Sequence, residues 1–148
     1  ILSDIRETEL ATIIQNFKEN EELAESLDGA WKFEGLVRME PGAEAVAIHG
    51  STTITKSKYR LRMDGNWLDE HGNVAGQWSA KQVFLDDQEL VYLFQVPDPN
   101  RPGLTANGLG RVSIRRDVNE KPEKLVGTWS VLGQEAMGSV TFNRASAD

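Results

Sequence analysis

Four basic residues alternate along one stretch of the chain and could bind an anion such as a phosphate. They are Lys56, Lys58, Arg60 and Arg62. In an unbroken strand all four side chains would share one face, because successive residues point to opposite faces. That face is either a solvated outer surface or, at a bulge or a barrel mouth, a place where one or two cations meet a phosphate. Arginine suits the second role because its guanidinium binds phosphate in a bidentate manner.

A second group of basic residues could likewise either face solvent or bind an anion. Arg111, Arg115 and Arg116 follow Gly108 and Gly110, two glycines that loosen the stretch in which they lie. Either these arginines face solvent, or Arg111 reaches an anionic ligand.

Aromatic residues would supply the other half of a nucleotide site. Bases stack on aromatic rings for roughly 1–3 kcal/mol each. The rings expected to face inward are Tyr59, Trp78, Tyr92 and Trp129. Their alternative role is core packing, and a buried Tyr or Trp also needs a partner for its polar group.

The residues that support catalysis or metal binding are sparse. The chain has no cysteine and two histidines, His49 and His71. It contains neither a Gly-X-Ser-X-Gly elbow nor a phosphate-binding Gly-X-X-X-X-Gly-Lys-Ser/Thr loop. The oxygen-rich segments 64–66 and 69–73 are typical of turns and lack the spacing of an EF-hand. We therefore expect a non-enzymatic protein with no cofactor and no metal.

The elements that position these residues are one helix and a series of strands. Helical spacing of apolar residues predicts an acidic amphipathic helix over residues 1–27, with a capping box at Asp4 and Glu7. Residues 1–28 hold eight acidic and two basic side chains, whereas the remainder is nearly neutral. This balance argues against binding to duplex nucleic acid. The helix either packs on the following domain or caps it, or it mediates self-association or a link to something upstream.

From Gly29 onward the apolar period changes to two, which predicts about eight strands over residues 28–144 and a frayed tail at 145–148. A bulge is expected at Gly50, and the third strand is expected to end at Asp64-Gly65-Asn66. Hairpins between successive strands favour an all-β, antiparallel up-and-down barrel, with a sandwich as the alternative. A barrel of this size holds one small ligand or is filled by its own side chains.

The motif Gly29-Ala30-Trp31 opens the first strand and Arg144 closes the last, while Gly127-Thr128-Trp129 echoes the motif near the other end. This arrangement resembles the calycin pattern of lipocalins and their relatives. The resemblance implies that Trp31 forms the floor of the barrel and that Arg144 packs across its ring. The chain departs from secreted lipocalins because it lacks disulfide cysteines and carries its helix at the N-terminus.

A closer resemblance is to the minimal β-barrel domain of membrane-anchored effectors in bacterial cyclic-oligonucleotide (CBASS) anti-phage defence. It implies a cytoplasmic domain that binds a cyclic dinucleotide and self-associates, anchored to the inner membrane through a segment before Ile1. The ligand would then contact a set of aromatic and basic residues. They are Tyr59, Arg60, Arg62, Trp78, Tyr92, Arg111 and Trp129.

Three other functions remain open. The barrel could carry an apolar small molecule such as a fatty acid, in which case its interior should be mostly aliphatic. It could be an enzyme of the nitrobindin or isomerase kind, which would need a histidine or a carboxylate to point into the lumen, and His49 is the candidate histidine. It could also be an interaction module that works through the acidic helix.

Overall fold

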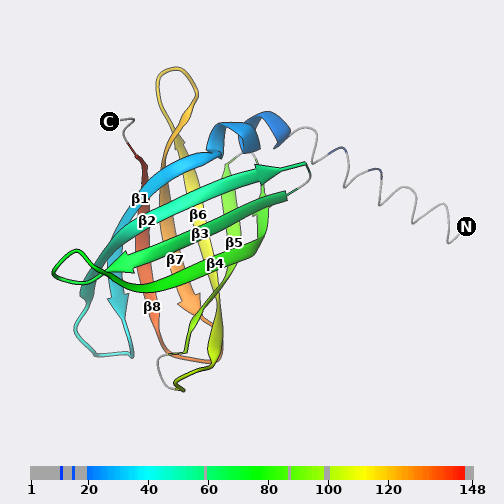
Figure 1. Cartoon of the computed structure of the whole chain (residues 1–148). Coiled ribbons are helices and arrows are strands. Elements are labelled where there is room, and N and C mark those ends of the chain that lie inside the picture. The colour runs from blue at the N-terminus through cyan, green and yellow to red at the C-terminus, as the bar shows by residue number, and fades with distance from the viewer. Residues whose placement is uncertain are drawn as a thin grey trace, which may run out of the picture.

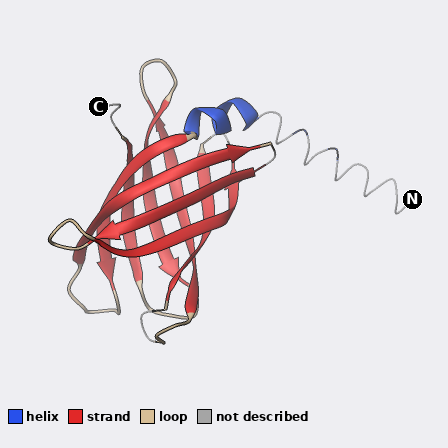
Figure 2. Cartoon of the chain, viewed as in Figure 1, coloured by secondary structure: helices blue, strands red, loops and turns tan. Residues whose placement is uncertain are grey.

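Eight antiparallel strands close into a barrel in the computed structural model, which describes residues 11, 15, 20–58, 60–86, 88–98 and 101–145. Each strand pairs with its neighbours in sequence, and the first pairs with the last (Figures 1 and 2). The predicted fold class is confirmed. The strands are β1 (Gly29–Arg38), β2 (Val46–Ser57), β3 (Arg60–Leu68), β4 (Val74–Leu85), β5 (Glu89–Pro97), β6 (Thr105–Arg116), β7 (Pro122–Val131) and β8 (Met137–Arg144).

Alternation of side chains decides which residues enter the barrel. In β6 every second residue from Ala106 to Ile114 is buried, and the residues between them are exposed. Gly108 and Gly110 do not loosen this strand, because it pairs with β5 without interruption from Thr105 to Ser113. The two glycines are buried positions of the inner face, and their neighbours on β5 explain why no side chain is present there.

Two local predictions about the strands were wrong. β2 has no bulge at Gly50, since its pairing with both β1 and β3 runs through that residue in register. A Cβ at Gly50 would lie 1.8 Å from the Asn66 carbonyl oxygen, so close packing against β3 explains the glycine. β3 does not end at Asp64-Gly65-Asn66 but continues to Leu68. Gly65 faces inward there, and the indole of Trp78 lies over it.

A short helix over residues 20–27 covers one end of the barrel (Figure 2). Leu23, Ala24 and Leu27 are buried and join the same core as Trp31. Lys56 lies 3.6 Å from the Glu21 carboxylate and 3.7 Å from that of Glu25, so the acidic side of the helix pairs with the start of the basic stretch. The remaining helix predictions, including the capping box, and the frayed tail at 146–148 lie outside the described residues.

Arg144 and Trp31 join the helix to the barrel. The guanidinium carbon of Arg144 lies 4.1 Å from the centroid of the Trp31 ring, which is the contact expected from the sequence. Arg144 donates hydrogen bonds to the carbonyls of Ser26, Leu27 and Asp28, the groups that a helix C-terminus leaves without an intrahelical partner. Trp31 Nε1 donates to the Leu27 carbonyl at 2.9 Å. Burial lowers the pKa of Arg144 from its ordinary, very high value.

Candidate functional site

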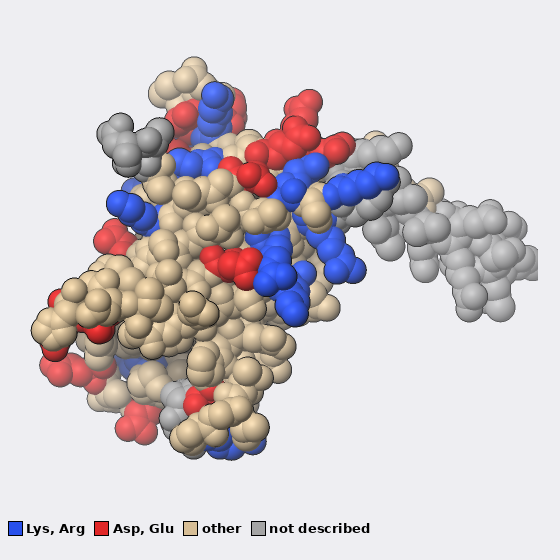
Figure 3. Space-filling view, in the orientation of Figure 1, with Lys and Arg blue, Asp and Glu red and all other residues tan. Residues whose placement is uncertain are grey.

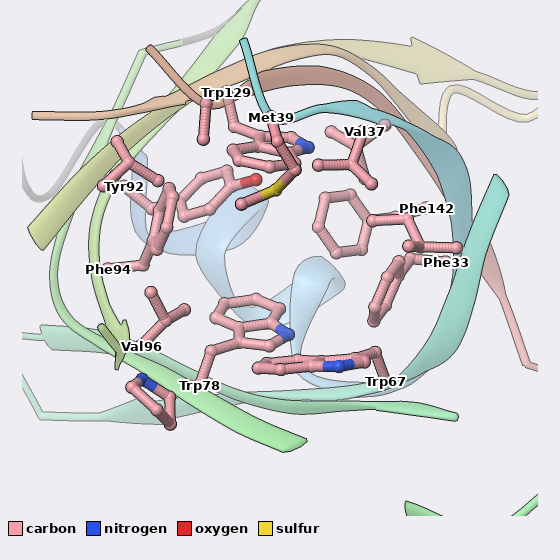
Figure 4. Close-up of a pocket in the computed structure, with 15 residues that line it drawn as sticks. Phe33, Val37, Met39, Trp67, Trp78, Tyr92, Phe94, Val96, Trp129 and Phe142 are labelled. Atoms are coloured by element: carbon pink, nitrogen blue, oxygen red, sulfur yellow. The ribbon is translucent and has the colours of Figure 1, made fainter. Parts of the chain in front are cut away.

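The half of the barrel away from the helix encloses a cavity of about 250 Å³. Aromatic and aliphatic side chains from every strand except β6, together with Met39 and Ala136 beyond the strands, form its wall (Figure 4). The lining residues are Phe33, Val37, Met39, Ile48, Trp67, Trp78, Tyr92, Phe94, Val96, Pro97, Trp129, Val131, Ala136, Val140 and Phe142.

Glycines on neighbouring strands keep the centre of this cavity open. Each of five aromatic residues in the lining lies directly opposite a glycine, and its ring covers the place where a Cβ would stand. The rings therefore lie along the wall instead of meeting at the barrel axis. The pairs are Tyr92 with Gly110, Phe94 with Gly108, Trp67 with Gly76, Trp78 with Gly65 and Trp129 with Gly138.

The rings also contact one another around the wall. The ring centroids of Trp78 and Tyr92 are 5.8 Å apart, as are those of Tyr92 and Phe94, and Phe94 meets Trp129 edge-on at 6.1 Å. These separations lie in the range of favourable aromatic pairs. Since Trp78, Tyr92, Phe94 and Trp129 are each held between a glycine and another ring, this part of the wall is shaped before any ligand arrives.

No charged side chain of the described residues lines the cavity. Its side-chain polar hydrogens belong to the hydroxyl of Tyr92 and the indole N–H groups of Trp67, Trp78 and Trp129. None of these four groups forms a hydrogen bond with the part of the chain that the structure describes. Burial raises the pKa of Tyr92, so its hydroxyl stays protonated at neutral pH. The cavity therefore suits an uncharged, mainly apolar molecule.

The predicted cations do not reach this cavity. Arg60 and Arg62 are exposed and alternate with the buried Leu61 and Met63, because β3 is regular at this point. Basic side chains gather on the outer surface near the helix (Figure 3). Arg62 donates two hydrogen bonds to the Asp64 carboxylate, at 2.8 and 2.9 Å, and this pairing raises its pKa.

Arg111 also lies outside the barrel. Its guanidinium is 2.8 Å from a carboxylate oxygen of Glu89 on β5, and this partner raises its pKa. The expectation that Arg60, Arg62 and Arg111 would surround a ligand together with the rings is therefore not met in the cavity. The cause is the uninterrupted alternation of β3 and β6, which turns each arginine away from the lumen.

Of the predicted rings, Trp78, Tyr92 and Trp129 come together in the cavity, whereas Tyr59 lies outside the described residues. Sequence reasoning missed four further rings of the lining. A signal for them was present, because each follows an inward-facing residue of its strand at an even spacing. These rings are Phe33, Trp67, Phe94 and Phe142.

The two histidines lie away from the cavity. His49 is exposed on β2, and His71 is exposed in the turn between β3 and β4, 3.5 Å from a Glu70 carboxylate oxygen. Among the described residues, no group of three or more His, Asp or Glu side chains could hold a metal ion. In the same part of the chain, no helix has the length and apolar character needed to cross a bilayer.

A polar cleft on the outer surface meets the cavity at one place in the wall. β4 pairs with β3 from Val74 to Ala80 but with β5 only from Ser79 to Leu85. Trp78 would face Val96 if this pairing continued, yet the two strands part there. Trp78, Val96 and Pro97 consequently line both the cavity and the cleft. The cleft is otherwise polar, and Gln77, Gln95 and Asn66 are among its lining residues.

The architecture and the cavity define a class of protein, a closed eight-stranded barrel with an apolar chamber, which is consistent with a calycin-like fold. No protein-family model matches the chain, and no curated protein matches it.

Proposed function

We propose that this barrel is a binding protein for a small, uncharged, mainly apolar molecule, which it holds in the cavity of the open half. One observation carries the proposal: fifteen apolar and aromatic residues enclose the cavity, and none of them bears a charge. Apolar pockets with few polar groups are the usual form of small-molecule sites. Eight-stranded barrels are wide enough to hold one such ligand.

The size and the wall of the cavity narrow the class of ligand. Its volume of about 250 Å³ is slightly below the roughly 300–1,000 Å³ of pockets for drug-sized ligands. Seven of the fifteen lining residues are aromatic and they are the largest side chains of the wall, whereas a fatty-acid carrier is expected to have a mostly aliphatic interior. Flat or ring-containing molecules match it best, because they can stack on Trp78 or Trp67 while filling the space between the rings.

Cyclic dinucleotide sensing by a membrane-anchored, self-associating anti-phage effector stays a prediction from the sequence resemblance. A ligand with two phosphates would bring two negative charges into a cavity without cations, and burying an unpaired charge costs several kcal/mol. A dinucleotide site would therefore have to use the outer cations, of which Arg60 and Arg62 are the exposed members on β3. The cavity favours the neutral ligand.

The test is calorimetry on the whole chain with three probes: 1-aminoanthracene, decanoate and cyclic di-GMP. We expect the neutral aromatic amine to bind most tightly. Val37→Trp, which fills the lumen, should weaken its binding at least about tenfold. The matched control is Leu36→Trp, since Leu36 is the next residue of β1 but points outward with 49% of its surface exposed. This control should bind like the wild type.

The opposite pattern would overturn the proposal. Binding of cyclic di-GMP that weakens with salt, survives Val37→Trp and is lost on substitution of Arg60 and Arg62 would support the nucleotide hypothesis. If none of the three probes binds, the proposed binding function is wrong.

A further inference from the structure

Among the residues that the structure describes, Tyr92 supplies the one side-chain oxygen in the lining of the cavity. The ring and its oxygen lie along the wall over Gly110 of β6, where the oxygen would be 2.5 Å from a Cβ, and the oxygen borders the cavity (Figure 4). Tyr92 is only 3% exposed, and its hydroxyl forms no hydrogen bond with the described residues. Among the described residues, the one fully buried side-chain polar atom without a partner is Thr52 Oγ1, so the Tyr92 oxygen is accessible from the cavity and its hydrogen-bond partner comes from there.

The ring of Tyr92 cannot turn to find a partner in the wall. Its Cζ would lie 2.0 Å from a Cβ at Gly110, so the ring rests directly on the backbone of β6. Three rings contact it, Trp78 and Phe94 with centroids 5.8 Å away and Phe142 with a centroid 6.1 Å away. The hydroxyl is therefore fixed in direction and remains a neutral donor, because burial raises its pKa.

The other side-chain N–H and O–H groups of the lining belong to tryptophans. Trp67, Trp78 and Trp129 contribute indole N–H groups, which cannot accept a hydrogen bond. An acceptor on a ligand thus finds several donors in the lumen, whereas a donor on a ligand finds the Tyr92 oxygen and the weakly accepting thioether of Met39. This imbalance selects ligands by the type of their polar atom as well as by shape.

We propose that the ligand carries an uncharged hydrogen-bond acceptor, such as a ketone or ether oxygen, that accepts the Tyr92 hydroxyl proton within an otherwise apolar ring system. This proposal rests on the proposed function and specifies its ligand. Tyr92 is then the residue that decides specificity, and the surrounding rings supply affinity.

A pair of probes with nearly the same shape tests this assignment. 2-Acetylnaphthalene has a carbonyl oxygen where 2-ethylnaphthalene has hydrogens, and both are neutral. Their dissociation constants are measured by quenching of tryptophan fluorescence in the wild type and in Tyr92→Phe. The ratio of the two constants is compared between proteins, so differences in the solubility of the probes cancel.

We expect Tyr92→Phe to weaken binding of the ketone by about 3- to 10-fold and to leave the hydrocarbon unchanged. Trp129→Phe, which also removes ring area, should weaken both probes alike. A ratio that is the same in wild type and Tyr92→Phe would overturn the proposal. Failure of both probes to bind the wild type would instead overturn the proposed function.

A measurement on the wild type covers the case in which Tyr92→Phe does not fold. The infrared carbonyl stretch of bound, ¹³C-labelled 2-acetylnaphthalene should lie below its frequency in hexane, as expected for a hydrogen-bonded ketone. A stretch at the hexane frequency would show that no donor reaches the oxygen and would overturn the assignment.

Discussion

In both halves of the barrel interior, side chains alternate between the inner and the outer face. One half is nevertheless filled by its side chains, whereas the other holds a cavity. Near the helix, Trp31, Ile54 and Leu125 have no exposed surface, and the core is filled. Toward the other end, rings of similar or larger size surround an empty centre. The large side chains differ in the residues opposite them. Five rings of the hollow half lie opposite glycines and rest on the wall, whereas Trp31 pairs with Thr52 and Arg144. The glycines of this half therefore keep its cavity open.

Truncating one tryptophan in each half gives the largest expected contrast. Trp31→Ala should destabilise the protein by about 3–5 kcal/mol, because it empties a filled core and removes the hydrogen bond to the Leu27 carbonyl. Trp67→Ala should cost clearly less, since that indole already borders a cavity. Urea denaturation of both variants measures this difference. Equal losses would contradict the division into a filled and a hollow half.

The second prediction removes a glycine from the wall. In Gly110→Ala the new methyl group would overlap the Tyr92 ring and push it into the lumen, at a cost of about 1–3 kcal/mol. Binding of 1-aminoanthracene should fall along with stability. Ser113→Ala, on the exposed face of the same strand, is the control and should change neither quantity. A Gly110→Ala protein with wild-type stability and affinity would show that the rings do not depend on the glycines.

The third prediction uses pH to probe the burial of the hollow half. Burial raises the pKa of Tyr92 above its ordinary value of about 10, so above pH 10 the unfolded chain loses a proton that the native state keeps. Native stability therefore falls as pH rises, by about 1.4 kcal/mol per pH unit from this group. Tyr92→Phe should lack that part of the decline when urea midpoints at pH 9 and pH 11 are compared. Parallel declines in both proteins would mean that Tyr92 is accessible to water.

The filled half was largely readable from the sequence. The change from a helical period to a period of two locates the start of β1 at Gly29. Trp31 and Arg144, near the two ends of the strand series, meet because closing a meander places its first and last strands side by side. Regular alternation of apolar residues carries this information, and long-range contacts follow from closure.

The hollow half was harder to predict, because its determinants lie on neighbouring strands. Asp64-Gly65-Asn66 has the composition of a turn, yet Gly65 lies within β3 as the seat of the Trp78 ring. Ending the strand there removed Trp67 from consideration. Arg111 faces outward because β6 pairs regularly with β5. The sequence did not establish this pairing, since Gly108 and Gly110 suggested an irregular strand. Register pairs such as Gly65 with Trp78 become visible only once the strands are aligned.

Because β4 and β5 part beside Trp78, the rate at which the proposed ligand exchanges depends on fewer residues than its binding affinity does. Ladder pairing between these strands stops at Ser79 and Gln95, so the wall beside Trp78 can widen without breaking a backbone hydrogen bond between them. A ligand leaving along this seam has only the contacts of the Trp78 ring and its neighbours to give up. The residence time of the proposed ligand then depends mainly on the Trp78 indole and its neighbours, whereas its equilibrium affinity depends on the whole aromatic wall.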